Sequence, residues 1–149
     1  MPVRIQAEPF DAGAELNRLG SGSGIGATAC FVGVVRSSAS KPVDKLVIEH
    51  YPGMTDSAVR SMLNEAVERW SLAECLIIHR FGELLPGEPI MMVAVQSAHR
   101  AEAFDAAAYL MDYLKSRAPF WKKEHYAGRA EWVECRNEDE AALARWLSE

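Results

Sequence analysis

Pro119 divides the last third of the chain into two segments with different expected structures. Proline cannot continue a helix, and it disfavours the helical conformation at the residue before it, here Ala118. Upstream, apolar residues recur at helical spacing, namely Phe104, Ala108, Met111 and Leu114. Downstream, residues 120–126 alternate in the manner of a short strand. The sequence therefore predicts a helix, a rigid corner and a strand.

Two lysines flank this corner. Lys115 follows Met111 by four residues, so its stem should pack at the end of the apolar face, where desolvation would lower its pKa. Lys122 should share one face of the strand with Phe120 and Glu124. This arrangement is typical of an anion site. The alternative is a helix end whose cations suit the helix dipole, followed by a solvated strand.

The charge distribution favours a local anion site over a broad nucleic-acid footprint. The formal net charge is −5, yet residues 111–124 carry four cations and two carboxylates. Residues 125–149 carry three arginines and six carboxylates. A nucleic-acid-binding domain would instead present a basic face.

The length of 149 residues fits a single domain spanning 1–149. No apolar run is long enough to cross a bilayer, and the N-terminus lacks the apolar segment of a signal peptide, so a cytoplasmic protein is expected. Three widely separated cysteines argue against a disulfide framework. Cys30 and Cys75 lie in apolar strand-like runs and are interpreted as core thiols, whereas Cys135 is left open.

The order of expected elements predicts an α+β domain with helices packed on a mixed or antiparallel sheet. Strands are expected at 3–7, 27–35, 46–51, 73–81, 89–96, 120–126 and 130–135, and helices at 11–19, 55–70, 98–118 and after Asn137. The apolar runs at 27–35 and 89–96 indicate central strands. Gly33 suggests a bulge or a close backbone approach, and Thr55 is the expected N-cap of its helix.

The start of the long helix carries His99 and Arg100, where free backbone N–H groups favour an anion. The alternative for His99 is a capping or packing role. We expect the corner at Pro119 to bring this helix start and the two lysines into one cleft. Arg36 ends a strand beside the loop 37–42 and is either an anion clamp or a solvated side chain. The remaining histidines show no metal-site spacing, so no bound metal and no cofactor are expected.

Five separated strings carry a family resemblance. They are M-D-Y-L-K-S-R-A-P-F-W-K-K-E at 111–124, F-V-G-V-V-R at 31–36, E-H-Y-P-G-M at 49–54, H-R-F-G-E-L at 79–84 and S-A-H-R at 97–100. Taken together in chain order, they resemble the large, catalytic subunit of molybdopterin synthase, and the resemblance spans about residues 26–136.

The resemblance implies an α/β-hammerhead-type fold and a homodimer. Each protomer would bind a small ubiquitin-like subunit, giving a heterotetramer. The C-terminal Gly-Gly tail of that subunit carries a thiocarboxylate and inserts into a pocket of the large subunit. The implied activity is a sulfurtransferase of molybdenum cofactor biosynthesis. It converts cyclic pyranopterin monophosphate to the dithiolene of molybdopterin, with sulfur delivered by the carrier and not by cysteines of this chain.

The resemblance also implies roles for particular residues. Lys115 is the candidate for direct chemistry, by proton transfer or an acyl intermediate, and Lys122 for stabilising negative charge. The residues implied in substrate binding are Val34, Val35, Arg36, His99, Arg100, Lys123 and Glu124. Arg36 is expected to reach the site of a neighbouring protomer. The serine-rich loop after Arg36, and valine at position 34, depart from the family pattern.

Two other functions fit the residues without the resemblance. One is a ferredoxin-like module that binds a small anion or RNA through the basic corner; its RNA binding would weaken steeply with salt. The other is a structural scaffold that uses the C-terminal helix, for which the sequence gives no positive signal.

Overall fold

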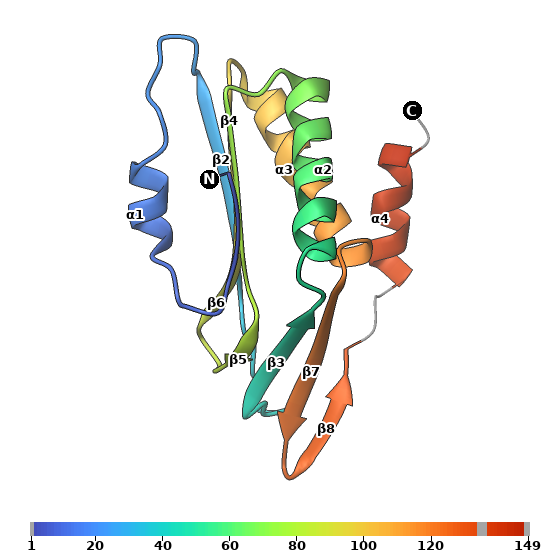
Figure 1. The fold of residues 1–149 in the computed structure, drawn as a ribbon. Helices are drawn as coiled ribbons and strands as arrows, with labels where there is room; N and C mark the ends of the chain where they lie inside the picture. The colour runs from blue at the N-terminus through green and yellow to red at the C-terminus, as the bar shows by residue number, and fades with distance from the viewer. Residues whose placement is uncertain (1, 134–136, 148–149) are drawn as a thin grey trace.

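The computed structural model describes residues 2–133 and 137–147, and Figure 1 shows the arrangement of its elements. The strands are β1 (Val3–Gln6), β2 (Ala27–Val34), β3 (Lys45–His50), β4 (Glu74–Arg80), β5 (Gly82–Leu84), β6 (Pro89–Ser97), β7 (Phe120–Tyr126) and β8 (Arg129–Trp132). The helices are α1 (Ala12–Asn17), α2 (Met54–Trp70), α3 (Arg100–Ser116) and α4 (Asn137–Leu147). The predicted α+β class is confirmed.

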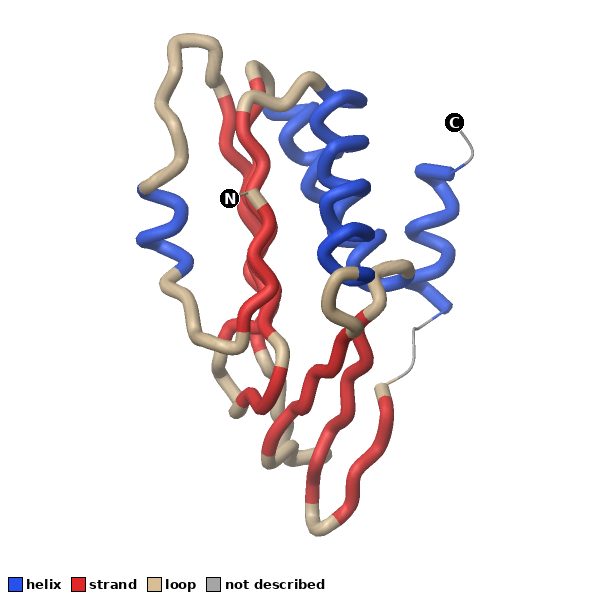
Figure 2. Tube along the Cα trace, viewed as in Figure 1, coloured by secondary structure: helices blue, strands red, loops and turns tan. Residues whose placement is uncertain are grey.

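The strands form two four-stranded sheets. The first has the order β1-β4-β6-β2, in which only the β1–β4 pair is parallel. The second has the order β5-β3-β7-β8 and is antiparallel throughout. Helices α2 and α3 lie on one side of the first sheet and α1 on the other, as the ribbon and the tube both show (Figures 1 and 2).

The main core lies between the first sheet and the helices α2 and α3. Its fully buried members include Val59, Ala66, Ile77, Val93, Val95, Ala106 and Leu110. A second cluster joins the two sheets and consists of Val35, Leu46, Ile48 and Leu84. A third lies under α1 and contains Leu76, Ile78, Met92 and Ala94. Because both faces of the first sheet are covered, β4 and β6 consist almost entirely of buried residues.

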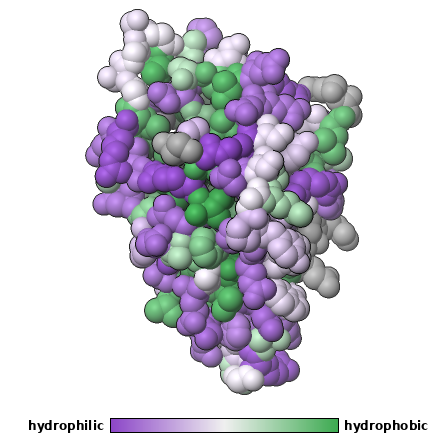
Figure 3. All heavy atoms as spheres, in the orientation of Figure 1, coloured by the Kyte–Doolittle hydropathy of each residue, from purple (hydrophilic) through white to green (hydrophobic). Residues whose placement is uncertain are grey.

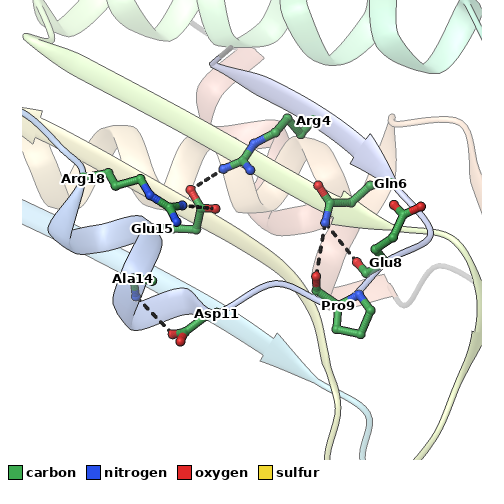
Figure 4. Close-up of polar contacts among 8 residues, drawn as sticks. All are labelled: Arg4, Gln6, Glu8, Pro9, Asp11, Ala14, Glu15 and Arg18. Atoms are coloured by element: carbon green, nitrogen blue, oxygen red, sulfur yellow. Dashed lines mark hydrogen bonds and ion pairs between the residues drawn. The ribbon is translucent and has the colours of Figure 1, made fainter.

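Helix α1 is fixed to the sheet by charge as well as by apolar contact. Asp11 caps it by accepting a hydrogen bond from the Ala14 N–H at 3.0 Å. The buried Glu15 carboxylate pairs with Arg4 of β1 and, at 2.8 Å, with Arg18 (Figure 4). Its pKa is lowered, chiefly by the hydrogen bond from Arg4. A carboxylate buried between two guanidinium groups remains charged and holds the helix in place.

The C-terminal helix α4 packs beside α3. The Trp146 indole N–H donates to Asp112 of α3 at 2.6 Å, and its ring meets Trp70 of α2 at 5.6 Å between centroids. On the face seen in Figure 3, hydrophobic residues form small groups among hydrophilic ones. None of the helices in the described ranges is long and apolar enough to span a bilayer.

Several expectations from the sequence are wrong. The segment predicted as a central strand at 27–35 is β2, which is an edge strand, and Cys30 on it is exposed. Residues 82–84 form the additional strand β5. Helix α2 is capped by Gly53; Thr55 lies inside it and donates its hydroxyl to the Tyr51 carbonyl at 2.8 Å. Hydrogen bonding within the turn therefore outweighed the N-cap preference of Thr55.

Other expectations are confirmed. The strand β6 is central, Cys75 is buried, and the β2–β6 register shifts between Gly33 and Val34. Cys135 and the side chain of Asn137 lie outside the part of the chain that the structure describes, as does the end of the strand predicted at 130–135.

Candidate active site

The corner at Pro119 is formed as the sequence predicts. Helix α3 ends at Ser116, and the Arg117 N–H bonds back to the Tyr113 carbonyl at 2.7 Å. Strand β7 begins at Phe120, whose N–H donates to the Ala118 carbonyl at 2.8 Å. Because β7 pairs with β3, the turn moves the chain from the first sheet's helical layer into the second sheet.

A cavity of about 280 Å³ lies at this junction. Its lining residues come from both sheets and from α3, and they are Phe31, Val32, Gly33, Val34, His79, Ile90, Met91, Met111, Leu114, Lys115 and Lys122. Apart from the two lysines and His79, these side chains are apolar or glycine. The cavity is thus an apolar site with two amines, and none of the described residues that line it is a carboxylate.

Lys122 is the more enclosed of the two amines. It is half-buried, and its pKa is lowered from 10.5 to about 8. Burial is the main cause, the charge of Lys115 adds to it, and Asp139 of α4 opposes it. Desolvation and a like charge both disfavour the ammonium form. An amine with this pKa is partly neutral near pH 7.5 and can both give and take a proton.

Lys115 also lines this cavity, but its side chain is exposed. Its position one residue before the end of α3, beside the buried Leu114, agrees with the predicted end of the apolar face. The sequence predicts desolvation at Lys115, but this side chain is exposed, and the enclosed amine is that of Lys122. The structure thus brings the two lysines together and gives them different environments.

His99 and Arg100 lie elsewhere in the same chain. They border a separate hollow with Gly26, Ala98 and Ala101 at the start of α3. His99 occupies the N-cap in an extended conformation, without a side-chain capping bond. Lys115 is near the other end of this 17-residue helix, about 22 Å away at 1.5 Å per residue. The expectation that the start of α3 and the two lysines form one cleft is therefore wrong within one protomer.

The structure places the predicted substrate-binding residues at the end of β2 in different surroundings. Val34 lines the cavity, whereas Val35 is 4% exposed and belongs to the core between the sheets. Arg36 is exposed and is not among the residues that line the cavity.

Lys123 and Glu124 also lie outside the cavity lining. The Lys123 ammonium lies over the Trp132 ring of β8, 5.0 Å from its centroid. Glu124 pairs with Lys41 at 3.5 Å. Both residues belong to β7 of the second sheet, next to Lys122, but their side chains contact Trp132 and Lys41 and are not among the residues that line the cavity.

Sequence reasoning missed most of the cavity wall. Phe31, Met111 and His79 were noted within the strings that carry the resemblance, and Met91 within an apolar strand, but none of them was assigned to the site. A single histidine in an otherwise apolar strand is a weak signal of a site. Its significance depends on the second sheet, which brings Lys122 next to it.

Comparison with known proteins gives the family. A family model described as "MoaE protein" matches residues 5–117, which is well over half of the chain. This chain belongs to the MoaE protein family. A MoaE relative from Cereibacter sphaeroides, named molybdopterin synthase catalytic subunit, is 56% identical over 147 residues, covering 98% of this chain and 100% of the relative. A relative of the same name from Escherichia coli K12 is 46% identical and covers 97% of each chain.

Solved structures agree with the MoaE assignment. The molybdopterin biosynthesis MoaE protein of Burkholderia ambifaria is 47% identical, with a TM-score of 0.82 over 99% of this chain and 98% of that one. Molybdopterin synthase from Staphylococcus aureus is 27% identical, with a TM-score of 0.80 over 88% and 96% of the two chains. The MoaE fold thus extends over nearly the whole of this protein.

Proposed function

We propose that this chain is the catalytic subunit of a molybdopterin synthase. It acts as a single domain, residues 1–149, in the cytoplasm. It transfers sulfur from the thiocarboxylated C-terminus of a small ubiquitin-like subunit to cyclic pyranopterin monophosphate and so forms the dithiolene of molybdopterin. The observation that carries this proposal is the apolar cavity in which Lys115 and Lys122 meet, in a chain of the MoaE family.

The shape and chemistry of the cavity suit the tail of the carrier. A Gly-Gly tail has no side chains, so it can enter a narrow apolar space that excludes bulkier peptides. Its terminal thiocarboxylate carries a negative charge, which the two amines can neutralise. None of the described residues that line the cavity is a carboxylate, which limits repulsion of that anion, and the carboxylate that acts on Lys122 belongs to Asp139 of α4.

The environments of the two amines suggest a division of labour. With its pKa of about 8, Lys122 is suited to move protons during attack of sulfur on the pterin side chain and opening of the cyclic phosphate. The more exposed Lys115 is suited to hold the thiocarboxylate or the negative charge that develops there. This revises the sequence-based hypothesis, which gave direct chemistry to Lys115, because burial acts mainly on Lys122.

Reconstitution tests the proposed activity directly. The chain is combined with the pterin precursor and with carrier protein in one of two forms, ending in a thiocarboxylate or in an ordinary carboxylate. Dithiolene product should form only with the thiocarboxylate, and two carriers should be consumed per product because each tail holds one sulfur. Tight binding of the carrier with no dithiolene formed from the thiocarboxylate would refute the proposal.

We further propose a homodimer in which each site uses residues of both protomers. Within one chain, His99 and Arg100 are too far along α3 to contact a ligand held between the lysines. A second copy can supply its own helix start to the cavity of the first. The backbone N–H groups of that start and the Arg100 guanidinium would then bind the substrate phosphate.

Mixing two inactive variants distinguishes a shared site from a site within one chain. Lys122→Ala and Arg100→Ala chains are unfolded together, refolded and assayed with carrier and precursor. If the site is shared, a mixed dimer has one intact site, and random pairing restores about a quarter of wild-type activity. If both residues serve the same site from one chain, no mixed dimer contains an intact site and activity does not return.

A further inference from the structure

His79 is a buried histidine of β4 to which the proposed function assigns no role. It is 2% exposed and lines the lysine cavity, next to Ile78 and Arg80, which face the core and the first loop. Histidine is seldom so fully buried unless its ring nitrogens have hydrogen-bond partners.

The hydrogen bonds fix the state of the ring. The His79 Nδ1 atom is 2.8 Å from the Arg80 carbonyl oxygen, and because a carbonyl can only accept, Nδ1 must carry the proton. In the neutral ring Nε2 then keeps its lone pair. Burial, followed by the charge of Lys122, lowers the His79 pKa to about 3, so the ring stays neutral at physiological pH.

The orientation of the ring is fixed by Phe120. The two rings stack at 3.7 Å between centroids and 13° between planes. Phe120 and Lys122 are two residues apart on β7, so their side chains leave the strand on the same face. His79 therefore lies against the same strand face from which the Lys122 amine extends into the cavity.

Among the described residues of the cavity lining, His79 alone has a side chain that offers a nitrogen or oxygen lone pair while the lysines are protonated. The remaining described lining residues are apolar, glycine or the lysines themselves. An amine enclosed by apolar walls needs an acceptor for at least one N–H once water is displaced. Lysine has a flexible stem, which lets its amine turn toward such an acceptor.

We propose that His79 is a positioning residue for Lys122, whose amine donates a hydrogen bond to the Nε2 lone pair and is thereby aimed at the bound carrier tail. A carboxylate in this place would pair with the ammonium and keep it protonated. A neutral imidazole orients the amine and still allows it to lose a proton. This inference rests on the proposed sulfurtransferase function and names a further residue of that site.

Other charged groups near His79 and Lys122 also influence the pKa values of these two residues. Lys122 is influenced by Lys115 of α3 and Asp139 of α4. His79 is influenced by the two lysines and by His50 of β3, whose Nδ1 lies 3.2 Å from the Thr55 hydroxyl. The variants below leave all of these groups in place, so a change in Lys122 titration reports the loss of His79 itself.

Two substitutions distinguish the effect of the hydrogen-bond acceptor at His79 from the effect of the size of the ring. His79→Phe keeps an aromatic ring against Phe120 and removes the lone pair. His79→Gln can place its side-chain oxygen near the position of Nε2 and restores an acceptor. The Lys122 amine is followed by NMR of ¹⁵N-lysine-labelled protein against pH, without carrier or substrate. The same variants are then assayed for kcat and for the KM of the thiocarboxylated carrier.

A hydrogen bond accepted from an ammonium favours the charged form. His79→Phe should therefore lower the Lys122 pKa by about one pH unit, the equivalent of one charge-assisted hydrogen bond. It should reduce kcat by about tenfold with little change in KM, and His79→Gln should recover most of both losses. An unchanged Lys122 pKa in folded His79→Phe, or equal loss of kcat in the two variants, would overturn the proposal.

A measurement on the unaltered protein covers the case in which His79→Phe does not fold. The ¹⁵N shifts of the His79 ring should show a neutral imidazole protonated on Nδ1 across about pH 5–8. A proton on Nε2 would leave no lone pair for Lys122 and would refute the inference. Because neither NMR experiment requires turnover, a negative result here would be distinct from a failure of the sulfurtransferase proposal.

Discussion

Replacing Lys122 with methionine should stabilise the protein in a strongly pH-dependent way. Methionine has a similar length and no charge, so it removes the desolvated ammonium and keeps most of the packing. The Lys122 pKa is about 8 in the folded protein and 10.5 as the reference for the unfolded chain. Near pH 7 the buried ammonium therefore costs about 3 kcal/mol of stability.

The sign follows from proton binding. Between about pH 8 and 10.5 the unfolded chain holds the Lys122 proton more tightly than the folded protein does, so the free energy of unfolding rises with pH. Below about pH 8 both states are protonated, and the full cost is present. The stability advantage of Lys122→Met over wild type should consequently fall from about 3 kcal/mol near pH 7 to about 1 kcal/mol near pH 10.

Urea unfolding of both proteins at these two pH values measures the difference. Taking wild type and variant at one fixed protein concentration cancels the other titrating groups and any contribution from association. A pH-independent difference in unfolding free energy would show that the Lys122 amine is solvated in the folded protein. It would refute the argument that burial tunes this residue.

Two further predictions concern parts of the fold that hold the site in place. Gly26→Ala should destabilise the protein by about 2 kcal/mol or more, because a Cβ there would lie 2.1 Å from the Ala98 carbonyl oxygen. The control Gly24→Ala, with open space around it, should have little effect. Equal melting temperatures of the two variants would contradict this prediction. Trp146→Phe should cost about 1 kcal/mol, because the indole hydrogen bond to Asp112 is lost while the ring contacts largely remain. Urea unfolding checks it, and an unchanged midpoint would mean that the bond contributes nothing.

The elements around the site were largely predictable because local signals and tertiary packing agree there. The proline at the corner, the helical spacing before it and the alternation after it each act over a few residues. The apolar run of β6 correctly indicated a central strand, since both of its faces are buried. Predicting these elements therefore required little knowledge of which distant segments pack together.

The errors arise where position depends on distant segments. The run at 27–35 is as apolar as β6, yet it forms the edge strand β2 with Phe31 42% exposed, and part of its apolar surface lines the cavity instead of the core. Apolar content cannot distinguish these two uses. The β2–β6 register is irregular after Gly33, where Ile90 of β6 is left without a partner between Met91 and Pro89. At this point the chain passes from Val34 in the cavity wall to Val35 in the core between the sheets.

The candidate site illustrates the same limit. Sequence motifs selected both lysines, which the structure places in one cavity. They also selected His99 and Arg100, which share the family pattern although the length of α3 separates them from the lysines. His79 was missed because its importance comes from stacking on Phe120 of the other sheet, a contact between residues 41 positions apart in the sequence.

The central claim is that Lys115 and Lys122 carry out chemistry on a thiocarboxylate held between them. Single-turnover dithiolene formation should be measured for Lys115→Ala and Lys122→Ala, with carrier affinity determined in parallel. The control is Lys45→Ala, which removes a lysine of β3 paired with Glu83 at 3.4 Å, away from the cavity. We predict that each cavity variant folds, binds the carrier and loses at least about a hundredfold in rate, while the control keeps its rate. Wild-type rates in either cavity variant would contradict the account.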